Sequence, residues 1–139
     1  RTGVRKNVLR STNIKEPNIS VEKSEVFEKL HKAIQQWTSE KGFLNGNISL
    51  SSLATELNTN TAYLSQVFNK NVGVSFSEYI SSCRVEYLVS EVKKSPELLS
   101  NKSSIQIAEM AGFMSIDAYT SAFKRHVGKT PRQYFKEIV

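Results

Sequence analysis

The sequence predicts an all-α fold in which two similar helix-turn-helix lobes are joined by one long linker helix and preceded by an additional N-terminal helix. After residue 49 the apolar residues recur at helical spacing, and no alternating run is long enough for a strand. One pattern occurs twice, in FNKNVGVSFSEY (68–79) and FKRHVGKTPRQY (123–134), at a constant offset of 55 residues. Between the copies, a helical pattern runs from Phe76 to about Ser95 and ends at Pro96. These observations predict two lobes and a connecting helix.

The residue pattern of the first 41 residues predicts an arm followed by a helix. Residues 1–21 show no sustained apolar period and contain Gly3 and Pro17, which is typical of a linker. From Val21 to about Lys41 the apolar residues follow one helical face, and two glycines and two asparagines in GFLNGN then end that helix. The expected organisation is a basic arm at 1–21, the N-terminal helix, first lobe and linker helix at 22–95, and the second lobe at 96–139.

The first lobe is predicted from two short helical patterns and their N-caps. Ser49 precedes a helix with Leu50, Leu53, Ala54 and Leu57 on its inner face. NTN turns the chain, and Asn60 precedes a second helix with Leu64, Val67 and Phe68 on its inner face. Two short helices and a tight turn form the skeleton of a helix-turn-helix, although any αα-corner shares this feature.

The repeated residues have local structural roles in both copies. Gly73 and Gly128 follow the last turn of a helix, where glycine adopts a left-handed conformation at little cost. S-x-x-E at 75–78 and T-x-x-Q at 130–133 have the spacing of a capping box for the next helix. Each copy therefore predicts a helix that ends at a glycine and is followed by a newly capped helix.

The letters GKT at 128–130 also close a phosphate-binding P-loop. A P-loop requires G-x-x-x-x-G-K-[S/T] between a strand and a helix. Phe123 stands where its first glycine would be, and neither a preceding strand nor a glycine-rich loop is predicted. Thr130 is most simply the N-cap of a helix whose first residue, Pro131, needs no N–H. The sequence therefore argues against nucleotide binding.

Composition argues against several other classes of function. No run of about 18 apolar residues occurs, so no membrane-spanning segment is predicted. The single cysteine, Cys83, allows no internal disulfide and is in helical register with core positions. His31 and His126 have no companion residues at metal-ligand spacing, and no catalytic triad or carboxylate pair is recognisable. We expect a protein that is not an enzyme and needs neither cofactor nor metal.

The cations are concentrated at the two ends of a chain with a net charge of +6. Residues 1–21 carry five cations against one acid, and residues 124–139 do the same. Basic ends predict a polyanionic partner such as nucleic acid or an anionic membrane surface. The charge distribution alone is explained equally well by basic tails that are exposed to solvent and bind no partner.

Together, these features resemble the DNA-binding domain of the AraC/XylS family of bacterial transcription regulators. The resemblance covers about 48–135 and is carried by LSSLATELNTNTAYLSQVFNKNVGVSFSEYI, CRVEYL, IQIAEMAGF and AFKRHVGKTPRQYF. The last segment is similar to the family's F-K-K-x-x-G-x-T-P-x-x-Y signature. Around KKSPELLSNKSS the chain is longer than is usual in the family. The resemblance implies two helix-turn-helix lobes that bind double-stranded DNA.

The helical faces and the resemblance indicate which residues face DNA. Gln66 is the best candidate for a base contact, because Gln can bond adenine N6 and N7 together, whereas Ala62 offers a methyl group. Asp117 either complements the helix dipole or accepts from a cytosine amine. The predicted base-facing residues are Thr61, Ala62, Ser65, Gln66, Asn69, Asp117, Ala118, Thr120 and Ser121. The predicted phosphate contacts are Lys70, Lys124, Arg125, Lys129 and Arg132. Arg84 is expected to reach a phosphate or to pair with an acid such as Glu56.

The length of the linker helix predicts how the two lobes would be used. About 20 residues span roughly 30 Å, close to the 34 Å or so of one DNA turn, so one chain can hold recognition helices in successive major grooves. We expect sequence-specific binding of double-stranded DNA by a bacterial transcription regulator that is cytoplasmic or the cytoplasmic part of a membrane-tethered protein. Expected partners besides DNA are an upstream sensor or effector domain absent from this chain, and a homodimer formed through it. The alternative is a helical protein-interaction module whose basic ends dock an acidic partner.

Overall fold

The computed structural model describes residues 15–139, with side chains from residue 22 onward. Within this range it contains helices and no strand, which confirms the all-α prediction. The predicted arm lies outside the described residues up to residue 14, and its last part belongs to the first helix, which begins at Lys15 rather than near Val21. The helices are α1 (Lys15–Ser39), η1 (Gly42–Leu44), α2 (Leu50–Glu56), α3 (Thr61–Val67), η2 (Phe68–Val72), α4 (Phe76–Lys94), α5 (Leu98–Asn101), α6 (Ser104–Met110), α7 (Ile116–Val127) and α8 (Pro131–Ile138).

The helices of the first lobe begin at the predicted caps. The Ser49 side chain accepts a hydrogen bond from the Ser52 backbone N–H at 3.0 Å, and Asn60 Oδ1 accepts from the Tyr63 N–H at 2.8 Å. After α3 the chain continues into a π-helical turn, η2, which the sequence pattern did not predict. Gly73 ends this turn with φ 96°. The glycine stop is therefore confirmed, but the helix before it is not a regular α-helix.

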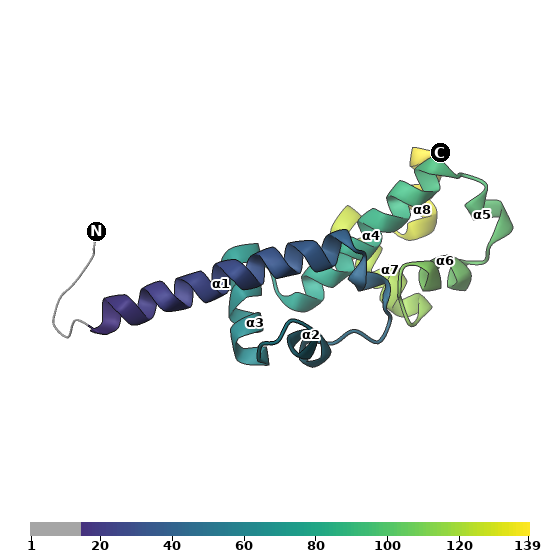
Figure 1. Ribbon diagram of the computed structural model, residues 1–139. Helices are drawn as coiled ribbons and strands as arrows, with labels where there is room; N and C mark the ends of the chain where they lie inside the picture. Colours follow the sequence, from purple (N-terminus) through teal and green to yellow (C-terminus); the bar gives the residue numbers. More distant parts are fainter. Residues whose placement is uncertain (1–14) are drawn as a thin grey trace.

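The first hydrophobic core lies between α1, α2, α3 and the first half of α4. Ile34, Leu53, Leu64 and Phe68 are fully enclosed in it, and Phe68 packs on the rings of Phe76 and Tyr79. Figure 1 shows α1 running across this lobe beside α3 and α4. The first lobe therefore includes α1.

The second hydrophobic core lies between α4 and the helices α6, α7 and α8. Phe123 of α7 is fully buried, and its ring lies 5.3 Å from those of both Tyr119 and Phe135. Edge-on aromatic pairs of this kind add to the stabilisation that comes from burial. The short helix α5 occupies the connection that the sequence showed to be long, outside the body of the lobe (Figure 1).

Helix α4 contributes to both cores. Ile80 and Cys83 belong to the first core, whereas Val85, Leu88 and Val92 belong to the second. Cys83 is buried in the first core, as its helical register predicted, and this burial raises the pKa of its thiol to about 11. The two lobes thus meet within the linker helix.

Arg84 of α4 joins three segments at this meeting point. Its Nε donates to the Phe43 carbonyl at 2.8 Å and its Nη2 to the Asn45 carbonyl at 3.0 Å, so it holds the loop around η1. Its guanidinium carbon also lies 5.6 Å from the ring centroid of Phe113 in the second lobe. Burial lowers the pKa of Arg84. Arg84 forms no ion pair with Glu56 in this structure, since two of its five N–H donors bond these carbonyls instead, and a contact with a phosphate stays a prediction.

The backbone of the second lobe approaches the η1 loop closely. Gly112, in the turn before α7, has φ 91°, and a Cβ added there would lie 2.7 Å from the Leu44 carbonyl oxygen and 3.0 Å from that of Phe43. A Cβ added to Gly46 would lie 3.0 Å from the Gly112 oxygen. Leu44 packs against both cores. The lobes are therefore in tight contact beside α4.

Gly112→Ala is expected to destabilise the protein more than Gly73→Ala. Both glycines have left-handed φ values, 91° and 96°, so both changes carry a similar conformational cost, about 1–2 kcal/mol. Open space surrounds Gly73, whereas a methyl group at Gly112 meets the backbone of Leu44, which adds about 1–3 kcal/mol of overpacking. Urea unfolding of the two variants measures the difference. Equal losses would contradict the close contact between the lobes.

Arg84→Lys is expected to lower the free energy of unfolding by about 1–3 kcal/mol, because an ammonium cannot reproduce the fork that bonds two carbonyls. The matched control is Arg132→Lys, since Arg132 is exposed and forms no ion pair with the described residues. That control should change stability by less than about 0.5 kcal/mol. Chemical denaturation of both variants tests the prediction, and similar small effects would show that Arg84 does not hold the η1 loop.

Candidate nucleic-acid interface

The first recognition helix, formed by α3 and η2, has one buried face and one polar face. Leu64, Val67 and Phe68 are fully buried. Of the predicted base-facing residues on this helix, Thr61, Ala62 and Asn69 are exposed, while Ser65 and Gln66 are half-buried. The π-helical turn begins at Phe68, so Asn69 follows a different angular spacing from the residues before it. The predicted DNA-facing residues between 61 and 66 therefore lie on one regular α-helix, whereas Asn69 points in a direction set by the π-helical turn.

The second recognition helix, α7, presents a similar arrangement without a π-helical turn. Asp117, Ala118 and Ser121 are exposed, whereas Thr120 is half-buried and the least accessible of the predicted set on this helix. Ser115 caps the helix, its Oγ accepting from the Ala118 N–H at 3.0 Å. Asp117 lies in the first turn, where a carboxylate complements the helix dipole, and its exposure leaves a base contact open as well.

The five predicted phosphate contacts divide into two groups. Lys70, Lys124 and Arg132 are exposed and form no ion pair with the described residues. The Lys70 ammonium lies 6.0 Å from the centre of the Phe27 ring, at the side of the first recognition helix. These three cations are available to an anionic partner.

Arg125 and Lys129 are instead engaged with acids of this chain. Arg125 Nε lies 3.0 Å from Glu78 Oε1, and its Nη2 donates to Ser81 Oγ at 3.3 Å. Lys129 pairs with both carboxylate oxygens of Glu137. A phosphate contact by either cation would have to replace its present partner. Sequence spacing did not indicate these pairs, because each forms across a turn or between lobes.

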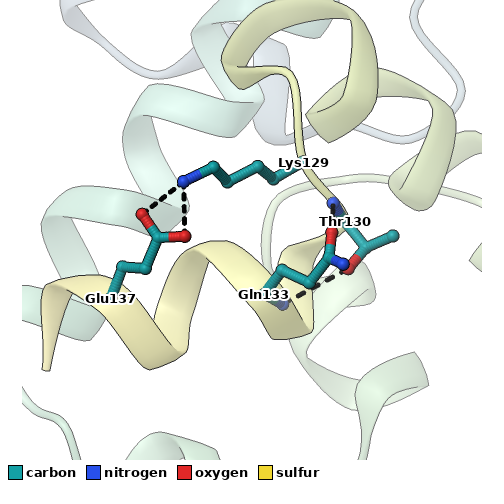
Figure 2. Close-up of polar contacts among 4 residues, drawn as sticks. All are labelled: Lys129, Thr130, Gln133 and Glu137. Atoms are coloured by element: carbon teal, nitrogen blue, oxygen red, sulfur yellow. Dashed lines mark hydrogen bonds and ion pairs between the residues drawn. The ribbon is translucent and has the colours of Figure 1, made fainter.

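The GKT segment, residues 128–130, connects α7 to α8: Gly128 is the C-cap of α7 and Thr130 is the N-cap of α8. Figure 2 shows Lys129 extended toward Glu137, and Thr130 and Gln133 bonded to each other's backbone. The Thr130 hydroxyl accepts from the Gln133 N–H at 3.2 Å, and the Gln133 side chain accepts from the Thr130 N–H at 3.1 Å. This reciprocal capping box confirms the predicted role of Thr130.

Other kinds of site find no support in the part of the chain that the structure describes. Between residues 15 and 139 there is no group of three or more His, Cys, Asp or Glu side chains placed to bind a metal. None of the helices described has the length and apolar character needed to cross a membrane. The polar and basic faces of α3 and α7 are thus the principal candidate site.

Comparison with known proteins identifies this arrangement. The family model of a helix-turn-helix domain matches residues 53–137. The Msm operon regulatory protein of Streptococcus mutans is 35% identical over 94 residues, which cover 66% of this chain and 31% of that protein. The chain therefore spans about a third of the length of this curated relative.

Solved structures show the same fold. The C-terminal domain of AraT, a response regulator from Geobacillus stearothermophilus, is 28% identical with a TM-score of 0.61, over 77% of this chain and 83% of that one. The C-terminal domain of the two-component response regulator yesN from Fusobacterium nucleatum is 30% identical with a TM-score of 0.61, over 77% of this chain and 98% of that one. The chain belongs to the AraC-type family of helix-turn-helix DNA-binding domains of transcription regulators, a family that is not enzymatic.

Proposed function

We propose that this domain binds double-stranded DNA in a sequence-specific manner, with α3 and α7 in successive major grooves on one face of the duplex. The observation that carries the proposal is the attachment of two capped recognition helices to one shared helix. Helix α4 has 19 residues and spans about 28 Å, somewhat less than the 34 Å or so of one DNA turn. A single chain then does what a dimeric repressor does with two subunits.

The two recognition helices would read DNA differently. The predicted base-facing residues of α3 are neutral, and Gln66 can satisfy both major-groove positions of an adenine. The base-facing residues of α7 include no Arg or Lys, while its last turn carries the exposed Lys124, which forms no ion pair with the described residues. We infer more base reading by α3 and more backbone anchoring by α7.

Phosphate anchoring would come from the unpaired cations and from helix N-termini. Lys70, Lys124 and Arg132 are exposed and have no acidic partner among the described residues. Backbone N–H groups at the starts of α4 and α8, near Ser75 and Thr130, can also bind phosphate oxygens. Lys129 can join them by exchanging Glu137 for a phosphate.

The rest of the regulator is inferred from its relatives. The chain matches less than a third of the S. mutans protein, and two similar solved domains are C-terminal domains of response regulators. We propose that a sensor or effector domain lies upstream and that homodimers form through it. A regulator of this kind would act in the cytoplasm, either free or tethered to the membrane.

Footprinting on the control regions of the protein's own operon should show two protected major grooves about one turn apart on one face. The affinity should fall steeply with salt, because each phosphate neutralised contributes a slope of about −0.9 in log K against log salt. A protein-interaction module that docks an acidic partner would leave no specific footprint there, and that result would count against the proposed function.

Gln66→Ala is expected to relax the preference at one base position, with a loss of about 1–3 kcal/mol on the preferred site only. Lys124→Ala should weaken all sequences alike and reduce the salt slope by about one unit. Binding measurements on the preferred and a substituted duplex separate the two effects. Both side chains lie outside the fully buried core, so unfolding of both variants would show that these faces have been assigned wrongly.

A further inference from the structure

The contact of Arg125 with Glu78 and Ser81 crosses between the lobes. Arg125 lies in the last turn of α7, the second recognition helix, whereas Glu78 lies in the first turn of α4. That turn follows the first recognition helix after the short segment 73–75. The contact therefore links the end of one recognition helix to the chain that directly follows the other.

Glu78 makes this contact in place of a local one. In α2, α6 and α8 the third helical residue returns its side chain to the backbone of the N-cap and closes a capping box. At α4, Ser75 accepts from the Glu78 N–H at 3.2 Å, but the carboxylate bonds Arg125 instead. Gln133 occupies the matching position of the repeat and does close its box. The box expected at 75–78 is thus half formed, and Glu78 serves the other lobe.

Arg125 and Arg84 hold α7 near its two ends. Arg84 packs on Phe113, which lies shortly before the start of α7, and Arg125 lies near its end. Their contacts on α4 are six residues apart, about 9 Å along the helix. Phe123 and its neighbours already pack α7 against α4 in the second core, and the Arg125 contact adds a fixed point outside that core, at the end of the helix. The Arg125 side chain is 48% exposed and that of Glu78 41%, so this contact contributes more to orientation than to overall stability.

We propose that Arg125 is a positioning residue: with Glu78 and Ser81 it fixes α7 relative to α3 and thereby determines the half-site spacing that the protein accepts. The proposal rests on the proposed function and changes the expected role of Arg125 from phosphate contact to inter-lobe contact. A protein whose recognition helices are held at fixed separation loses affinity when the half-sites are moved apart or together, because it must distort itself or the DNA.

The test compares duplexes, selected with the wild-type protein, in which the two half-sites are moved in steps of one base pair. The variants are Glu78→Gln and Arg125→Gln, and the matched control is Glu137→Gln, which removes an ion pair within the second lobe. The spacing preference is the ratio of the affinity for the selected half-site spacing to the affinity for a shifted spacing. We expect the first two variants to lower this ratio about two- to fivefold. Arg125→Gln should leave the affinity for a single half-site and the salt slope unchanged. The control should keep the wild-type dependence of affinity on spacing, even where release of Lys129 raises its affinity for every duplex alike.

A phosphate-anchoring role for Arg125 gives a different result. Arg125→Gln would then weaken binding to every duplex, including the single half-site, and reduce the salt slope by about one unit. Glu78→Gln would leave the spacing preference intact. That pattern would overturn the proposal.

A second measurement is independent of DNA binding. Spin labels at Ala62→Cys and Ala118→Cys, in a Cys83→Ala background, report the distance between α3 and α7. We expect Glu78→Gln to broaden the distance distribution and Glu137→Gln to leave it narrow. An unchanged distribution in Glu78→Gln would overturn the positioning role. A broadened distribution in a protein that binds no specific DNA would retain that role and reject the proposed function.

Discussion

The hydrogen bonds from Arg84 to the Phe43 and Asn45 carbonyls are the constraint on which the arrangement of the lobes depends. They fix the η1 loop against α4 where the turn at Gly112 of the second lobe comes so close that an added Cβ would lie 2.7 Å from the Leu44 carbonyl oxygen. The same guanidinium packs on Phe113. A shift of the η1 loop would leave donors and carbonyls without partners, and a shift of Phe113 would remove the ring on which the guanidinium packs.

This constraint matters because the individual helices are short. Helices α2, α3 and α6 have seven residues each, far below the length at which an isolated helix is stable in water. They persist because their apolar faces are buried, and α4 supplies part of the burial for both lobes through Ile80 on one side and Leu88 on the other. The lobes are thus better described as two cores that share a helix than as two independent domains.

Local chemistry made most helix boundaries predictable from sequence. Ser49, Asn60 and Thr130 cap helices through their own side chains, and Gly128 ends one by its backbone freedom, so neighbouring residues suffice. The partners of Arg84 could not be predicted, since they are backbone carbonyls 41 and 39 residues away and every residue has a carbonyl. The π-helical turn η2 was missed because no residue type demands an i+5 hydrogen bond. The base-facing assignments stay predictions, because exposure alone does not identify a base contact.

The two copies of the repeat keep the same local chemistry and differ in how their exposed charges are used. Both contain a glycine stop followed by a serine or threonine cap. In the second copy, Lys129 is paired with Glu137 of its own lobe, and Val74 stands at the matching position of the first. In the first copy, Glu78 stands at the position that matches Gln133, and it pairs with Arg125 of the other lobe. Capping residues determine where helices begin, and the remaining positions are free to diverge. We infer that these free positions, more than the repeat itself, distinguish the roles of the two lobes.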